Sequence, residues 1–72
     1  MNNLNVAKIQ LNGKPYKINI GINLNQLLNG LNIQKNKVAI EVNGEIVEKN
    51  KYPSLILNKN DKVEIVQFIG GG

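Results

Sequence analysis

The chain opens with two short segments in which apolar and polar residues alternate. Apolar side chains occupy every second position from Ala7 to Leu11, and again from Tyr16 to Ile20. A period of two is typical of a half-buried strand. Between the segments, Asn12-Gly13 is a residue pair that accepts positive φ in a two-residue turn. The pattern therefore predicts a β-hairpin, with Pro15 at the start of its second strand, where a sheet tolerates a missing N–H donor.

The next segment changes to a helical period. Four leucines spaced by three and four residues form one apolar stripe: Leu24, Leu27, Leu28 and Leu31. Asn23 is predicted to cap this helix, and Gln26 can complete a capping box by reaching back to it. Gly30 inside the helix costs about 1 kcal/mol relative to alanine. We therefore expect a short helix that begins near Leu24 and ends by Asn32.

The second half of the chain predicts three further strands. A hairpin from Val38 to Val47 turns at Asn43-Gly44. The segment from Glu48 to Leu57 has no clear period and contains Tyr52-Pro53, so it predicts an irregular crossing with one helical turn. Leu55 and Leu57 are expected to hold this crossing to the core. Residues 62 to 68 are predicted to form the last strand.

The predicted order of elements is β-β-α-β-β-β. A hairpin, one crossing helix and further strands place a single short helix on one face of a mixed sheet, which is an α+β arrangement. The length of 72 residues allows one domain, covering residues 1–72. The absence of cysteine excludes disulfides, thiolate zinc sites and thiol catalysis.

Composition limits where the protein is expected to act and which partners it is expected to bind. No apolar run approaches the roughly 18 residues of a membrane span, and the residues from Met1 to Asn5 lack the charged and apolar regions of a secretion signal. We therefore expect a cytoplasmic protein without membrane contact. The net charge of +4 comes from nine lysines and no arginine, and the lysines scatter from Lys8 to Lys62. Without arginine forks or aromatic residues interleaved with a basic stripe, no nucleic-acid partner is predicted.

The residues needed for catalysis are missing. The sequence has no histidine or cysteine, and Ser54 lacks a base that could activate it, so a nucleophilic triad cannot be built. The alternation places most of the five carboxylates on strand surfaces or in turns, which is typical of solvated positions and not of an acid–base pair. The sequence therefore favours a binding or carrier role.

The sequence ends with Gly70-Gly71-Gly72, directly after the apolar residues of the last predicted strand. Glycine has no Cβ and adopts extended and left-handed conformations alike, so such a tail can enter a narrow cleft and present its carboxylate closely. A frayed end or a remnant of cloning is the alternative interpretation of terminal glycines.

The order of elements, the size and the diglycine end resemble the β-grasp, or ubiquitin-like, family. At finer grain, residues 39–47 (Ala-Ile-Glu-Val-Asn-Gly-Glu-Ile-Val) followed by residues 61–72 are similar to the thiamine-pathway sulfur carriers of the ThiS family. The resemblance begins near Ala7, so residues 1–6 are interpreted as an extension and residues 70–72 as a flexible tail. Tyr52-Pro53 departs from the tryptophan-containing segment that relatives often carry.

The resemblance implies a carrier that acts as a co-substrate and is not itself an enzyme. A ubiquitin-activating-enzyme-like adenylyltransferase of the ThiF type would use ATP and magnesium to adenylate the carboxylate of Gly72. A cysteine desulfurase or rhodanese-type donor would then supply sulfur, leaving a thiocarboxylate. A ThiG-type thiazole synthase would take this sulfur into the thiazole ring of thiamine. No cofactor is expected on the carrier itself.

The residues around the tail are expected to contact these enzymes. Gly71 would give the tail the clearance and reach that it needs to enter a narrow cleft. Gly70 would add one more residue to the tail. Val66 and Phe68 are predicted on the sheet face opposite Val63 and Ile65, so that, together with Ile69, they would form a docking patch. Two other functions fit the same tail: the small subunit of a molybdopterin-synthase-like complex, and a ubiquitin-like protein modifier.

Overall fold

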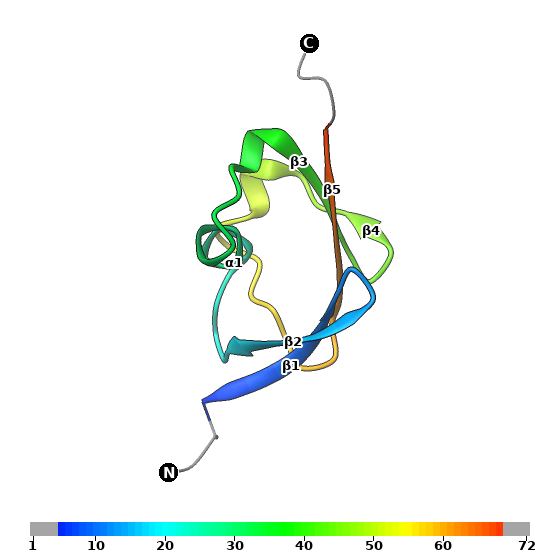
Figure 1. The fold of residues 1–72 in the computed structure, drawn as a ribbon. Coiled ribbons are helices and arrows are strands. Elements are labelled where there is room, and N and C mark those ends of the chain that lie inside the picture. The colour runs from blue at the N-terminus through cyan, green and yellow to red at the C-terminus, as the bar shows by residue number, and fades with distance from the viewer. Residues whose placement is uncertain (1–4, 69–72) are drawn as a thin grey trace.

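Residues 5–68 fold as a single mixed sheet with one helix against one of its faces (Figure 1). The computed structural model describes residues 5–68. The five strands are β1 (Val6–Leu11), β2 (Lys14–Asn19), β3 (Val38–Val42), β4 (Glu45–Ile46) and β5 (Lys62–Gln67). The helix α1 spans Leu24–Gly30, and two 3₁₀ turns, η1 and η2, span Lys35–Lys37 and Lys49–Lys51. The predicted order of elements and the α+β arrangement are confirmed.

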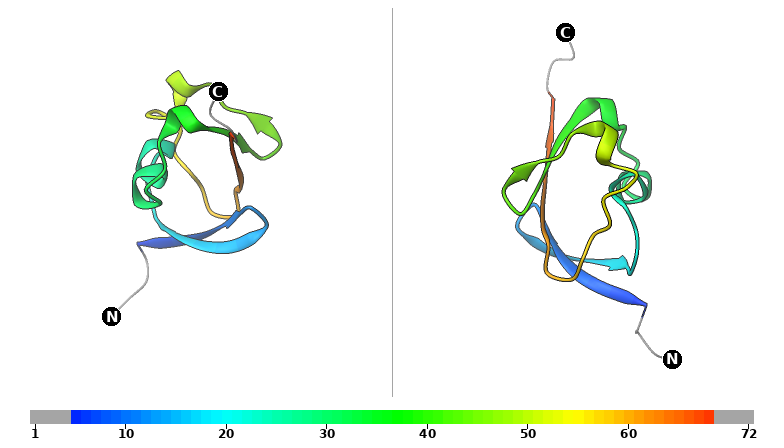
Figure 2. Two further views of the ribbon diagram at one scale, coloured as in Figure 1. Left: turned by 45° about the horizontal axis from the view of Figure 1, so that its top comes forward. Right: turned by 180° about the vertical axis from the view of Figure 1, so that it is seen from behind.

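The sheet has the strand order β2-β1-β5-β3-β4, so the last strand of the chain lies in the middle. β5 runs parallel to β1, where Gln10 pairs with Lys62 and Leu11 with Val63. On its other side, β5 pairs antiparallel with β3 over five positions. The central position of β5 brings its end to the same end of the molecule as η1 and η2 (Figure 2).

Both predicted hairpins turn at their Asn-Gly pairs. Asn12 and Gly13 have φ values of 51° and 82°, and Asn43 and Gly44 have values of 54° and 86°. Positive φ at both central residues is the conformation whose twist matches that of the flanking strands. The pairs therefore act as the sequence predicted, by closing two-residue loops.

The boundaries of the first hairpin differ from the prediction. β1 begins at Val6, which pairs with Asn19, so the last residue of the segment interpreted as an extension lies in the sheet. The alternation predicted through Ile20 was wrong at its last position, because β2 ends at Asn19 and the Ile20 side chain is 61% exposed. The chain bends away from the sheet at Gly21, which has a φ of 94°.

Helix α1 begins as predicted and ends in a motif that was not predicted. The Gln26 N–H donates to Oδ1 of Asn23 at 2.8 Å, and the Asn23 N–H donates to Oε1 of Gln26 at 2.9 Å, which confirms the capping box. Gly30 is the last helical residue and not an interior one. Asn32 then adopts a φ of 61°, and the Ile33 N–H donates to the Leu28 carbonyl at 3.0 Å. This is a Schellman-type helix end with asparagine in the position that glycine usually occupies.

The core lies between α1, the inner face of the sheet and the crossing that includes η2. The crossing contributes Leu57, which is buried, and Leu55, which packs against the core, as predicted. It also contributes Tyr52, whose side chain is the largest of those fully buried. Within residues 5–68 the Tyr52 hydroxyl finds no hydrogen-bond partner. Burial raises the pKa of Tyr52 above its ordinary value of 10.0, and the nearby backbone of Ile40 only partly offsets this effect.

Candidate functional site

The candidate site is the end of β5, from which the glycine tail continues. β5 ends at Gln67, but its pairing with the segment that precedes β3 extends one residue further, because the Phe68 N–H donates to the Lys37 carbonyl at 2.9 Å. The predicted attachment residue Gly72, with Gly70, Gly71 and Ile69, lies outside the described residues. The roles assigned to these four residues therefore stay predictions.

The turn asparagine of the first hairpin fastens the first four residues of β5. Oδ1 of Asn12 accepts from the Ile65 N–H at 2.7 Å, and its Nδ2 donates to the Ile65 carbonyl at 3.3 Å. The Asn12 backbone N–H also donates to the Val63 carbonyl at 2.9 Å. The side-chain amide of Asn12 thus continues the pairing between β1 and β5 beyond the end of β1.

The second hairpin holds β5 from the opposite side in a similar way. Oδ1 of Asn43 accepts from the Lys62 N–H at 2.9 Å, and its Nδ2 donates to Oδ1 of Asp61 at 3.0 Å. The sequence predicted Asn12 and Asn43 as turn formers only. Their reach to β5 has no local signal, because the strand they bind follows much later in the chain.

The outward side chains near the end of β5 are apolar and exposed. Val63 is fully buried and Ile65 packs against the core, whereas Val66 and Phe68 are 55% and 57% exposed. The structure therefore places Val66 and Phe68 on the face opposite the core, where a partner can reach them. Their function in docking stays a prediction.

The register extends this outer face beyond the residues that the sequence singled out. Ala39 lies opposite Val66, Glu41 lies opposite Glu64, and Ile46 on β4 lies opposite Glu41. Ile46 is 72% exposed, so three exposed apolar side chains share this face with a pair of glutamates. Like charges directly opposite one another lower the stability of a sheet. Ile46 escaped the sequence analysis because only the pairing of β3 with β4 reveals which face it occupies.

A lysine from the crossing contacts the end of β5. Nζ of Lys49 donates to the Val38 carbonyl at 2.9 Å and lies 5.7 Å from the centroid of the Phe68 ring. A cation over the face of an aromatic ring is attracted to it. Lys49 therefore connects η2, the first residue of β3 and Phe68, which is a contact that sequence reasoning missed.

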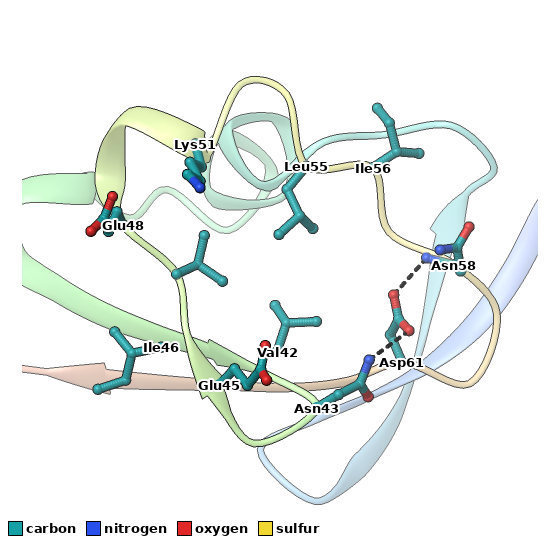
Figure 3. Close-up of a pocket in the computed structure, with 11 residues that line it drawn as sticks. Val42, Asn43, Glu45, Ile46, Glu48, Lys51, Leu55, Ile56, Asn58 and Asp61 are labelled. Carbon is teal, nitrogen blue, oxygen red and sulfur yellow. Dashed lines mark hydrogen bonds between the residues drawn. The ribbon is translucent and has the colours of Figure 1, made fainter.

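A hollow of about 700 Å³ lies away from the end of β5, between β4 and the segment that follows η2 (Figure 3). Apolar side chains, among them Val42 and Leu55, line it together with polar residues at its margin. The carboxylate of Asp61 is already bound there, since Oδ2 accepts from the Asn58 N–H at 2.7 Å. Within residues 5–68, no group of three potential metal ligands occurs, and no helix is long and apolar enough to cross a membrane. We assign no chemistry to this hollow.

Comparison with known proteins identifies the family. The family model described as the ThiS family matches residues 9–72. The chain belongs to the ThiS family. The sulfur carrier protein ThiS of Bacillus subtilis is 38% identical to it over 66 residues, which cover 89% of this chain and 98% of that protein. A thiazole synthase of Magnetococcus marinus is 43% identical over 65 residues, but this chain spans only 20% of the length of that protein.

A solved structure supports the same assignment. The crystal structure of the thiamine biosynthesis protein ThiS from Geobacter metallireducens matches with a TM-score of 0.78 and 32% sequence identity. The match covers 90% of this chain and 99% of that one. The ThiS resemblance and the β-grasp fold inferred from the sequence are therefore confirmed.

Proposed function

We propose that Gly72 of this ThiS-family chain is first adenylated and then converted to a thiocarboxylate, which donates its sulfur to the thiazole ring of thiamine. Membership of the family makes the chain a sulfur carrier of thiamine biosynthesis, and the chemistry at the terminus is the part that we propose. The family match supports the proposal because it extends to Gly72. The proposal requires that Gly72 carries the free carboxylate.

The order of the proposed steps follows from the chemistry of a carboxylate. With a pKa of about 3.5, the terminal carboxyl group is ionised at neutral pH and is a poor acyl donor. A ThiF-type adenylyltransferase would use ATP and magnesium to attach AMP, releasing pyrophosphate and creating a good leaving group. The persulfide of a cysteine desulfurase or rhodanese-type donor would then attack the acyl adenylate, so that AMP leaves as an acyl disulfide forms. A second thiol would reduce this disulfide, which releases the thiocarboxylate and leaves the donor's cysteine sulfur in a new disulfide.

The fold supports delivery of such a group to another protein's active site. The beginning of β5 is hydrogen-bonded to both neighbouring hairpins, so the segment leading to the tail starts from a fixed position. Val66 and Phe68 are exposed at the end of β5, and we propose that they, with Ile69, dock both the adenylyltransferase and a ThiG-type thiazole synthase. After sulfur transfer, the bare carboxylate of Gly72 would return for another cycle.

Intact mass spectrometry tests the proposal directly. The chain is incubated with the adenylyltransferase of the same organism, ATP, magnesium and a sulfur donor. We expect one oxygen to be replaced by sulfur, with the change located at Gly72 by fragmentation. A variant that lacks Gly71 and Gly72 is the control and should gain neither AMP nor sulfur. An unmodified full-length chain, or a modified control, would contradict the proposal.

The same loaded protein identifies the acceptor. Transfer of sulfur to the product of thiazole synthase is the expected outcome. Transfer to a pterin precursor would instead indicate a molybdopterin-type carrier, and an isopeptide bond to lysine would indicate a protein modifier.

A further inference from the structure

Two turns with the same sequence lie at the end of the molecule where β5 finishes. η1 has the sequence Lys35-Asn36-Lys37 and η2 has the sequence Lys49-Asn50-Lys51. Figures 1 and 2 show both turns beside the start of β3 and the end of β5. Four of the nine lysines, which are far apart in the sequence, therefore belong to turns at the end of the molecule where β5 finishes.

Hydrogen bonds fix both turns to this position. The Lys37 carbonyl accepts from the Phe68 N–H, and Nζ of Lys49 binds the Val38 carbonyl beside the Phe68 ring. The side chains of Lys35, Lys37 and Lys51 are exposed, and that of Lys49 is half-buried. We call these four lysines the basic patch; Lys51 lies at its margin, where it also lines the hollow beside β4.

The patch is strongly positive for a protein of this size. It holds four of the nine lysines of the chain. Glu48 is the single acidic residue in the two turns and their N-caps. Phe68, exposed and apolar, lies next to it, and Val66 shares the outer face of the sheet with Phe68 and with Glu64. An apolar centre with a charged margin is the usual composition of a transient protein interface.

We propose that the basic patch binds an acidic surface around the tail-binding cleft of the adenylyltransferase. The inference rests on the proposed function, because a protein that takes hold of residues 69–72 must approach the end of β5. Carboxylates placed around such a cleft would face the lysines. Complementary charges at the margin of an interface accelerate association and align the partners before the apolar contacts form.

An acidic protein surface fits the patch better than a nucleic acid does. The chain contains no arginine, which is the side chain that binds phosphates through a planar fork. Among residues 5–68, two aromatic residues adjoin the patch: the ring of Phe68 lies 5.7 Å from Nζ of Lys49, and Tyr52, which follows η2, is fully buried and cannot stack on a base. A surface that binds single strands would carry several aromatic residues for base stacking.

Two triple variants with the same change in net charge test the proposal. Lys35, Lys37 and Lys51 are replaced by glutamine in one variant. Lys8, Lys14 and Lys17, exposed on the first hairpin, are replaced in the control. Lys49 is kept because its ammonium group has a structural hydrogen bond. The dissociation constant and the association rate for the adenylyltransferase are then measured without ATP at low and high salt.

We expect the patch variant to bind about tenfold more weakly at low salt, mainly through a slower association rate, and to lose most of the salt dependence. The dissociation constant of the control should change by less than about twofold, since its lysines lie on the first hairpin and not on η1 or η2. Thermal unfolding of both variants shows that each has remained folded.

Other outcomes would overturn the inference. An equal loss in both variants would mean that net charge alone matters, and no loss in either would remove the patch from the interface. Unchanged enzyme binding, with loss of binding to a labelled single-stranded oligonucleotide in the patch variant alone, would assign the patch to nucleic acid. If the native chain binds the enzyme but is never adenylated, the proposed function fails, while the two dissociation constants still decide the role of the patch.

Discussion

The two ends of β5 differ in how firmly they are held. At its beginning, β5 is paired with β1 and β3, and the side chains of Asn12 and Asn43 add hydrogen bonds from both sides. At its end, β5 is paired with β3 alone, and Val66 and Phe68 are more than half exposed. Both ends belong to one strand of six residues.

This difference shows how a small domain can combine stability with access. A chain of 72 residues buries only about 60% of the surface that its unfolded form exposes. Each apolar side chain left exposed therefore reduces an already small hydrophobic contribution to stability. The fixed beginning of β5 contributes Val63 to the core, and its end leaves the apolar side chains of Val66 and Phe68 accessible. The comparison predicts that substitutions at the beginning change stability, whereas substitutions at the end change partner binding.

The largest expected contrast is between two valines of the same strand. Val63→Ala removes two methyl groups from a fully buried position and should lower the free energy of unfolding by about 2 to 3 kcal/mol. Val66→Ala, at an exposed position, should lower it by less than about 0.5 kcal/mol. Urea unfolding of both variants measures the difference. Similar losses in the two variants would remove the distinction between the ends of β5.

Removing one fastening at the beginning of β5 should have the next largest effect. Asn12→Ala loses both side-chain hydrogen bonds to Ile65 and forces alanine to a φ of 51°, so we expect a loss of about 2 kcal/mol in unfolding free energy. Asn12→Gly removes the hydrogen bonds without the backbone strain and should lose about 1 kcal/mol. If both variants unfold like the native protein, the asparagine does not fasten β5.

A substitution at the exposed end should affect binding and not folding. Phe68→Ala removes an exposed ring from the proposed docking patch and should weaken binding to the adenylyltransferase about tenfold. Its melting temperature should change little, because the ring contributes few core contacts. Calorimetric binding and thermal unfolding provide the two measurements. A large drop in melting temperature with unchanged affinity would instead assign Phe68 to the core.

The smallest expected change in stability concerns Tyr52, in the core against which the beginning of β5 packs. Tyr52→Phe removes a buried hydroxyl that lacks a partner within residues 5–68, so stability at pH 7 should stay equal or rise by up to about 1 kcal/mol. A clear loss of stability would show that the hydroxyl is hydrogen-bonded after all.

The same variant has a signature at high pH. Because burial raises the pKa of Tyr52 in the folded state, the unfolded chain loses this proton first as the pH rises above 10.0. The native protein should therefore lose stability from that pH up to the folded-state pKa, and Tyr52→Phe should lack this part of the decline. Parallel pH titrations of unfolding in the two proteins measure it.

Much of the fold could be predicted because its signals are local. The strands follow a period of two, the helix follows spacings of three and four, and the Asn-Gly pairs mark both hairpins. The capping box joins residues only three positions apart, so Asn23 and Gln26 identify it without knowledge of the rest of the structure. The resemblance to the ThiS family likewise depended on short motifs and on the glycine end.

The errors and omissions lie where the outcome depends on distant residues. The Ile20 alternation failed because the chain leaves the sheet at Gly21 to reach the helix. The burial of Tyr52 could not be foreseen, since the crossing has no period of its own. The bonds of Asn12 to Ile65 join residues 53 positions apart.

The sequence by itself determined the elements, their order, the family and the candidate terminus, because each of these depends on residues within a few positions of one another. The tertiary structure decided which side chains hold β5, which face Ile46 shares with Val66, and that two lysine turns meet at the end of the last strand. The physical reason is that strand register and the meeting of distant segments are set by the burial of the whole core. No short stretch of sequence contains that information.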